Sequence, residues 1–297
     1  MDNRLLLVGL ITTLGCGGTP ATPTDAAVGG DAFMAPAPAL ALMGGGVPDY
    51  SCIGTATAPA ATAPVAATLH ANEFLSSADV TMQSIEVWTN NVIGTACAAP
   101  NCMMVTTDAM GDVMATAPGT AWFAYRLPAS TGTAQVLAYN RRWNATAGGM
   151  LTITAFSSGT ISTVSALLAR TFSPTAGAAS GTVEDCMGRG VMNAQIRLFT
   201  GGAEVIGGAP ADRATPRITG LQGTSPTASR LTGDGGTFVG ANVPPGDYRV
   251  EVYGTMTAGG TPMLVGCEEG MIVGGGITVF TIGGVRSDYA AGSGCSR

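Results

Sequence analysis

The sequence contains no lysine, and charge of either sign is sparse. All thirteen basic residues are arginines, charged residues make up only 11% of the 297 positions, and the formal net charge is −6. An acidic chain without a basic cluster lacks the electrostatic footprint of a nucleic-acid-binding protein, so we expect no nucleic-acid partner. The missing lysine also excludes isopeptide bonds from a lysine amine, which leaves disulfides as the available covalent staples.

Histidine is almost absent as well. The single histidine, His70, lies in a strand-like stretch, and we expect it on or near the surface. The sequence has neither the H-E-x-x-H pattern of zinc peptidases nor a G-x-S-x-G turn that would position a nucleophile. We therefore expect a protein that is not an enzyme, with no catalytic residues, no metal site and no cofactor. The open alternative is a hydrolase of unrecognised type, which would have to depend on His70.

Long hydrophobic runs are also missing. The longest, Leu5 to Ile11, is too short to cross a bilayer as a helix, and it lies between Arg4 and a few small residues. This is the pattern of a secretion signal over residues 1–16. Its last four residues, which end at Cys16, resemble the lipobox of bacterial lipoproteins, in which the cysteine thiol is acylated and becomes the new N-terminus.

The lipobox resemblance implies a lipid on Cys16, and hence a membrane partner through an N-terminal lipid anchor. Acyl chains would hold the protein at the cell envelope, since each buried methylene contributes about 0.8 kcal/mol. With Gly17 rather than aspartate after the cysteine, the resemblance favours the outer membrane over the inner one. The alternative is an ordinary cleaved signal with an incidental cysteine.

Residues 17–50 are alanine, glycine and proline with almost no periodic pattern. Such a segment cannot bury enough surface to offset its ordering entropy, so we predict a disordered linker there.

Glycine is abundant (44 residues), and the rest of the chain has many short strand patterns separated by turns. We predict an all-β protein of two tandem antiparallel β-sandwiches, over residues 51–160 and 180–297. The strict alternation of Tyr248–Tyr253, which follows a Pro-Pro-Gly turn, is typical of a half-buried strand. A connector over 161–179 holds the one predicted helix, 162–170, with Val164, Leu167 and Leu168 on one face.

The two blocks repeat one another. Val80–Thr89 aligns without gaps on Val191–Thr200, and this alignment predicts that four residues lie in the two cores: Ile85, Val87, Ile196 and Leu198. Downstream, the stretch 107–113 matches 232–238, and each is followed by a Pro-Gly turn.

The second block carries a family pattern: G-x-V-x-D at 181–185, V-x-x-A-x-I at 191–196, T-x-x-x-G-x-F at 232–238 and P-P-G-x-Y-x-V at 244–250. It resembles the carboxypeptidase regulatory-like domain, a transthyretin-type sandwich of about seven strands, and the first block is a looser version of it. Both blocks behind a lipobox resemble lipoproteins of the myxobacterial type. The resemblance implies fold and location, because such modules occur on many unrelated surface proteins.

Seven cysteines are present, and removing Cys16 for the lipid leaves an even number in an exported chain. Three disulfides follow from that count, although six cysteines allow fifteen pairings. We predict Cys97–Cys102 first, Cys186–Cys267 second and Cys52–Cys295 last. Zinc is the competing interpretation of the C-x-x-x-x-C spacing, but no second close cysteine pair accompanies it.

The expected function is a non-catalytic surface or periplasmic lipoprotein that displays structural or binding sandwich modules. The first alternative is a carbohydrate- or peptide-binding protein with a protein or glycan partner. It would use residues 201–229, which are polar and longer than a simple hairpin loop. Arg141–Trp143 is interpreted as an edge strand or loop, with a contact for a sugar or acidic ligand as the alternative. Glu268-Glu269 is interpreted as a solvated turn.

Overall fold

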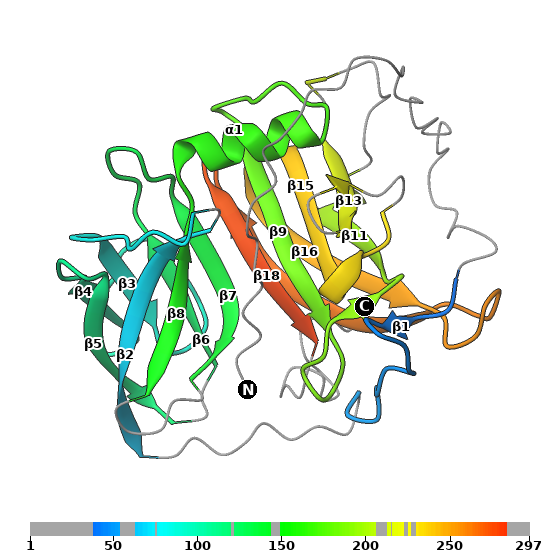
Figure 1. Ribbon diagram of the computed structural model, residues 1–297, viewed down its shortest axis with the longest axis horizontal. Coiled ribbons are helices and arrows are strands. Elements are labelled where there is room, and N and C mark those ends of the chain that lie inside the picture. The colour runs from blue at the N-terminus through cyan, green and yellow to red at the C-terminus, as the bar shows by residue number, and fades with distance from the viewer. Residues whose placement is uncertain are drawn as a thin grey trace.

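The computed structural model describes residues 38–53, 63–74, 76–119, 122–143, 149–205, 213–214, 216–222, 225–226 and 230–283. The leader 1–16 with Cys16, the tether residues 17–37 and Cys295 lie outside the described residues. The described part is built of strands with one α-helix, and it forms two β-sandwiches side by side (Figure 1). The predicted all-β sandwich fold is therefore confirmed.

The first sandwich faces a three-stranded sheet against four other strands. The three-stranded sheet has the order β5-β2-β8: β5 (Asp112–Pro118), β2 (Pro64–Glu73) and β8 (Met150–Ala155). The strands opposite are β4 (Cys102–Thr106), β3 (Ser84–Trp88), β6 (Trp122–Leu127) and β7 (Val136–Arg142). Alternate residues of both layers fill one hydrophobic core between them.

The second sandwich has the same two layers with a few additions. One sheet has the order β12-β11-β16-β17: β12 (Ala203–Glu204), β11 (Gln195–Thr200), β16 (Gly246–Gly254) and β17 (Met263–Ile272). The strands opposite are β13 (Arg217–Gln222), β15 (Thr237–Val243), β9 (Gly177–Glu184) and β18 (Ile277–Gly283), with the two-residue β14 (Ser225–Pro226) at the edge. The short η1 (Asp234–Gly236) precedes β15.

The two sandwiches share one sheet. The last described strand, β18, pairs in parallel with β9 of its own sandwich and, through residues 277–279, with β7 of the first. This pairing joins the two halves into a nine-stranded sheet with the order β14-β13-β15-β9-β18-β7-β6-β3-β4. Figure 1 shows β18 beside β7 at the junction. The small sheets pack on opposite faces of it, because β18 gives Ile277 to the first core and Phe280 to the second.

Strand pairing in the two sandwiches supports the internal repeat. In the first, β2 pairs antiparallel with β5 and parallel with β8; in the second, β9 does the same with β15 and β18. Likewise β3 lies between β4 and β6, as β11 lies between β12 and β16. The four residues predicted as core from the gapless alignment, Ile85, Val87, Ile196 and Leu198, are all fully buried.

One buried threonine in each sandwich makes the same pair of hydrogen bonds. Thr107 Oγ1 accepts from the Gln83 N–H and donates to the Val80 carbonyl oxygen, both at 2.9 Å. The partners of Thr232 are the Ala194 N–H at 3.0 Å and the Val191 carbonyl oxygen at 2.6 Å. These partners occupy the aligned positions, so the threonine fixes the same loop twice.

Strand β16 has the predicted alternation, but it is more deeply buried than predicted. Tyr248, Val250 and Val252 face the core, as expected. Glu251 on the opposite face is only 1% exposed, so the strand is not half-buried. Its carboxylate accepts hydrogen bonds from the Tyr253 hydroxyl and pairs with Arg249, which provides the partners that a buried charge requires.

The one α-helix, α1 (Ser158–Leu167), begins four residues before the predicted 162–170. Ser157 is its N-cap, with the side-chain oxygen accepting from the Thr160 N–H at 3.1 Å. Leu168 is buried against β15 together with part of Val164, whereas Leu167, predicted for the same face, is 48% exposed. In the chain the helix lies between β8 of the first sandwich and β9 of the second, and it also packs against β15 of the shared sheet (Figure 1).

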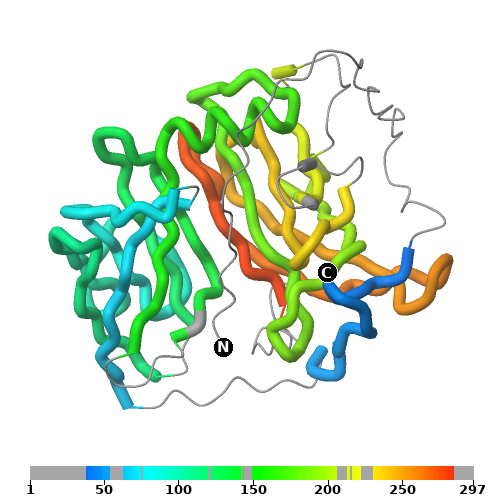
Figure 2. Tube along the Cα trace, viewed as in Figure 1, coloured from blue at the N-terminus to red at the C-terminus, as the bar shows by residue number. Residues whose placement is uncertain are grey.

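The C-terminal part of the predicted linker is folded, which corrects the range 17–50. β1 (Ala41–Leu42) pairs with β10 (Val191–Met192), and the Leu40 N–H donates to the Thr255 carbonyl oxygen at 2.8 Å. Leu40 and Leu42 are buried in the second core. Figure 2 shows residues 38–53 as the blue tube that lies along the second sandwich. Two leucines in this otherwise small-residue stretch supply the apolar surface that orders it.

Three predicted loop or ligand segments are parts of the framework. The range 201–229 contains β12, β13 and β14, so it is not one long loop; its residues 206–212, 215, 223–224 and 227–229 lie outside the described residues. Trp143 is fully buried and its indole N–H donates to the Val65 carbonyl oxygen, which excludes it as a ligand contact. Glu268 lies in β17 and is 4% exposed, so the predicted solvated turn is wrong.

Candidate functional site

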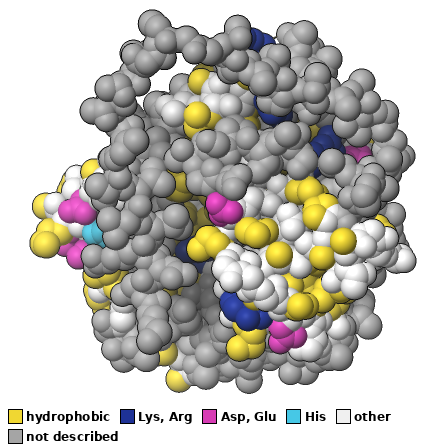
Figure 3. All heavy atoms as spheres, turned by 45° about the vertical axis from the view of Figure 1, so that its right-hand side comes forward, with side chains coloured by type: hydrophobic (Ala, Val, Ile, Leu, Met, Phe, Trp, Pro, Cys, Tyr) yellow, Lys and Arg dark blue, Asp and Glu magenta, His cyan; other side chains and the backbone are white. Residues whose placement is uncertain are grey.

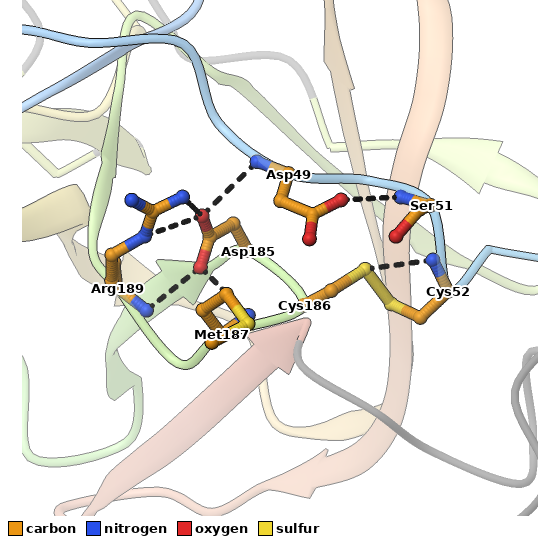
Figure 4. Close-up of a disulfide and its surroundings, with 7 residues drawn as sticks. All are labelled: Asp49, Ser51, Cys52, Asp185, Cys186, Met187 and Arg189. Carbon is orange, nitrogen blue, oxygen red and sulfur yellow. Dashed lines mark hydrogen bonds and ion pairs between the residues drawn. A yellow bond between two sulfur atoms is a disulfide. The ribbon is translucent and has the colours of Figure 1, made fainter.

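The most elaborate cluster of polar and covalent contacts surrounds a disulfide between Cys52 and Cys186. This bond joins the segment before the first sandwich to the turn after β9, 134 residues later. The Cys52 N–H also donates to the Cys186 sulfur at 3.0 Å (Figure 4). The predicted pairs Cys186–Cys267 and Cys52–Cys295 were wrong, because Cys52 and Cys186 bond to one another.

Asp185, next to Cys186, is the hub of this cluster. Its side chain is fully buried, and its carboxylate accepts two hydrogen bonds from the Arg189 guanidinium, at 2.9 and 2.6 Å. It also accepts from the backbone N–H groups of Arg189, Met187 and Asp49, which Figure 4 shows converging on it. Burial alone would raise the pKa of the Asp185 carboxyl, but the hydrogen bonds from Arg189 and the backbone hold it below its usual value.

This cluster is structural rather than catalytic in its chemistry. Every contact of Asp185 serves to close the 185–189 turn and to attach residue 49 to it. Asp185 is the aspartate of the G-x-V-x-D pattern, so the sequence contained a signal for it. The role of Asp49 had no sequence signal, because it depends on a contact across 136 residues.

The second disulfide is Cys97–Cys102, and its prediction is confirmed. Glu86 lies beside it, with its carboxylate within 4.8 Å of both sulfurs. The arrangement does not favour zinc, because sulfurs joined in a disulfide are not thiolate ligands. Glu86 is instead paired with Arg126 at 2.7 Å, and the guanidinium of Arg126 also lies over the Trp88 ring.

A third cysteine bond involves Cys267 on β17, which is also disulfide-bonded. All five described cysteines are therefore oxidised. Of the remaining two, neither Cys16 nor Cys295 lies within the described residues.

Arginines and aromatic rings alternate on the outer side of the four-stranded sheet. Arg197 lies over the rings of Phe199 and Tyr253, at 5.1 and 5.7 Å from their centroids. Its guanidinium pairs with Glu204 at 2.6 Å, and Arg230 pairs with the other oxygen of the same carboxylate at 2.8 Å. Glu204 on β12 is thus shared by two arginines, and Arg197 also contacts Tyr253, so the cluster holds β11, β12 and β16 together.

His70 lies on β2 between two carboxylates. Its Nδ1 is 2.7 Å from Asp112 of the neighbouring strand, and its Nε2 is 3.5 Å from Asp79. Within the described part of the chain, no hydroxyl group is recorded as a hydrogen-bond partner of the imidazole ring. The geometry places an imidazole–carboxylate hydrogen bond across β2 and β5 and does not assemble a nucleophile with its base.

Glu73, at the end of β2, ties the first sandwich to the start of α1. Its carboxylate accepts hydrogen bonds from the Thr160 hydroxyl, from the Ser157 N–H and from Ser76. Burial would raise the pKa of Glu73, but these hydrogen bonds, led by that from Thr160, lower it to about 2. The carboxyl is thus a structural acid rather than a proton donor near neutral pH.

One surface depression of ≈ 590 Å³ lies where β15 ends and the chain turns into β16. Its lining is mostly apolar and includes Phe172, Pro216, Pro244 and Pro245. Among its polar side chains, the Asn242 amide already donates to two backbone carbonyl oxygens, and the hydroxyls of Ser173 and Thr175 are hydrogen-bonded to each other. The depression has the chemistry of a contact surface for apolar groups.

The chain has only weak similarity to known proteins. No protein-family model and no curated protein matches the chain. Among solved structures, the shaft pilin SpaA from Lactobacillus rhamnosus GG aligns over 75% of this chain and 98% of its own, with 10% identity and a TM-score of 0.25. A Streptococcal ancillary pilin aligns over 74% and 62%, with 12% identity and a TM-score of 0.23.

The Bacillus anthracis TIE protein aligns over 73% of this chain with 10% identity and a TM-score of 0.24. This chain spans about a third (33%) of that protein's length. The described strands by themselves define the class: an all-β protein of two repeated sandwiches that share a sheet. No helix in the described part of the chain has both the length and the hydropathy needed to cross a membrane.

Proposed function

We propose that the protein is a non-catalytic lipoprotein of the cell envelope, anchored through Cys16, that displays two sandwiches of the carboxypeptidase regulatory-like kind. The observation that carries the proposal is the oxidised state of all five described cysteines. Disulfides form and persist in secreted and periplasmic proteins and are rare in the cytosol. This supports export, for which the N-terminal 16 residues provide a signal.

The residues that carry the family resemblance support a structural role. Asp185 closes a turn, and Thr232 bridges two backbone groups. The Tyr248 hydroxyl donates to the Pro244 carbonyl oxygen at 2.8 Å, which fixes the Pro-Pro-Gly turn. None of these contacts presents a reactive group to a substrate, so the pattern identifies a scaffold.

The number of cysteines gives the lipoprotein proposal a testable consequence. Cys267 is bonded, the other four described cysteines bond to one another, and the sequence holds two further cysteines, Cys16 and Cys295. Acylation uses the Cys16 thiol. The lipoprotein proposal therefore requires a Cys267–Cys295 disulfide.

Two measurements on cells that express the full chain test this. Labelling with an alkyne-bearing fatty acid should tag the wild type and the Cys295→Ser variant but not Cys16→Ser. Non-reducing peptide mapping should recover the Cys267 peptide linked to the Cys295 peptide. The proposal would be wrong if a disulfide-linked Cys16–Cys267 peptide were found, or if Cys16→Ser were labelled as strongly as the wild type.

A peptide- or carbohydrate-binding role is the second candidate. The apolar depression beside Phe172 favours it, because proline and phenylalanine surfaces suit a proline-rich peptide or a sugar ring. A glycan and peptide array should then give a signal that Phe172→Ala abolishes and that Phe74→Ala, a change at a 51%-exposed phenylalanine elsewhere, leaves intact.

A further inference from the structure

Methionine is distributed against its usual preference. Fourteen methionines are present, and all but Met1 and Met34 fall in the described part of the chain. Methionine is among the residue types most often buried. Here none of the twelve described methionines is buried and nine are exposed: Met43, Met82, Met104, Met110, Met114, Met150, Met187, Met256 and Met263.

The exposed methionines are dispersed. They lie on strands of both sandwiches, such as Met104 on β4 and Met263 on β17, and in turns, such as Met187. On the face shown in Figure 3, hydrophobic side chains of several types lie among polar groups on the described surface. Docking of a single partner would need the nine methionines gathered in one patch. The property that the nine share is instead the accessibility of the sulfur.

We infer that the exposed methionines form a reactive surface for two-electron oxidants, of which hypochlorous acid is the representative probe. The thioether sulfur is the nucleophile. An S–O bond forms, the O–Cl bond breaks, chloride and a proton leave, and the sulfur is oxidised by two electrons to the sulfoxide. Each methionine thus consumes one equivalent of oxidant.

The fold suits this chemistry because none of the described methionines is fully buried, and only Met103 and Met271 pack against a core from its edge. Sulfoxide formation converts an apolar side chain into a polar one, which disrupts a core that contains methionine. Here none of the buried residues is a methionine, and the described cysteines are already disulfides. Oxidation of the nine exposed side chains therefore changes the surface and leaves the packing intact.

Two methionines on one sheet provide an internal comparison. Met114 on β5 and Met150 on β8 both lie in register with Thr68 on β2, and they are 58% and 63% exposed. The Thr68 hydroxyl donates a hydrogen bond to the Met114 sulfur at 3.3 Å. That bond engages a sulfur lone pair, so Met114 should react more slowly than Met150 at almost equal exposure.

The first test is a titration of the full-length protein with hypochlorous acid, followed by intact mass and peptide mapping. The nine exposed methionines should each gain one oxygen, about 16 Da, before the part-buried Met103, Met192 and Met271 react. The protein should keep a single cooperative thermal transition, because changes at exposed side chains perturb the folded state little. Loss of the folded state as the first oxygens enter would overturn the inference.

The second test separates reactivity from exposure alone. Thr68→Val should raise the oxidation rate of Met114 to that of Met150 and leave the oxidation rate of Met150 unchanged.

A methionine-containing reporter peptide should survive longer beside the wild type than beside a variant with all nine exposed methionines changed to leucine. A smaller variant with Met104, Met114 and Met150 changed to leucine serves if the larger one misfolds. Equal loss of the reporter beside wild type and variant would refute the oxidant-consuming role.

Discussion

Removal of the Cys52–Cys186 disulfide should destabilise the protein far more than removal of Cys97–Cys102. The first bond closes a ring across a sequence separation of 134 residues, and the second across a separation of 5. In the chain-entropy description, the entropy that a cross-link removes from the unfolded chain grows with the logarithm of the ring size. That relation gives about 5 kcal/mol for the long ring and about 2 kcal/mol for the short one.

The assay is thermal and urea unfolding of two double variants, Cys52→Ala with Cys186→Ala and Cys97→Ala with Cys102→Ala. For a protein of this size each 1 kcal/mol corresponds to roughly 2–4 °C in the midpoint, so the long-ring variant should melt about 10–20 °C lower than the wild type. The short-ring variant should lose less than half of that. Circular dichroism below the transition should be unchanged in both.

An equal or larger loss in the short-ring variant would refute the entropic reasoning. It would mean that the local contacts of each cysteine, rather than the length of chain that it closes, set the stability. A third variant, Asp49→Ala, removes the side chain beside the long-ring bond while the bond remains. It should cost less than about 1 kcal/mol, because the Asp49 carboxylate accepts its hydrogen bond from the exposed N–H of residue 51.

Three further predictions follow from single side chains. Thr107→Val and Thr232→Val should each cost about 1–3 kcal/mol in unfolding free energy, and by similar amounts, because each leaves one buried N–H and one buried carbonyl without a partner; a twofold difference between them would contradict the structural repeat. Gly236→Ala should destabilise strongly, since φ is +75° and a Cβ would lie 2.3 Å from a backbone oxygen, whereas at Gly235 the nearest atom is 4.0 Å away and the change should cost only about 1 kcal/mol by urea unfolding. The folded-state pKa of Glu73 is depressed to about 2 from a usual 4.5, so its stabilisation is present above pH 4.5 and is lost as pH falls toward 2. Glu73→Gln should remove that part of the pH dependence of the unfolding free energy between pH 4.5 and 2, and an unchanged pH profile would show that the carboxylate is not stabilised.

Local patterns predicted the parts of the fold that depend on local physics. The alternation in 248–253 and the gapless match of 80–89 on 191–200 identified core strands. Successive side chains of a strand point to opposite faces, so burial on one face gives a period of two in consecutive residues. The helix was predicted to begin four residues too late. Its N-cap is Ser157, but Ser158 offers the same side chain, so the residue type did not single out the capping position. The ordered segment around the leucines at 40 and 42 was missed, because the small residues around them are typical of a linker.

Long-range pairing left no such signal. The pairing of β18 with β7 joins residues about 140 positions apart. The sequence of either strand is compatible with an edge position or a central position in a sheet. The same holds for Cys52 and Cys186, where fifteen pairings were open and only the closeness of Cys97 to Cys102 singled one out. The burial of Glu251 could not be foreseen either, because the alternation places it on the face opposite the core, and its partners Tyr253 and Arg249 are evident only in the folded strand.

The position of β18 in the shared sheet has a consequence for biogenesis. Synthesis proceeds from the N-terminus, so the first sandwich emerges with the edge of β7 open, and the strand that covers it is the last described segment of the chain. Until residues 277–279 arrive, that edge can pair with any other extended segment. The two repeats therefore mature together rather than one after the other, and a ribosome or translocase that stalls before residue 277 leaves both halves unfinished.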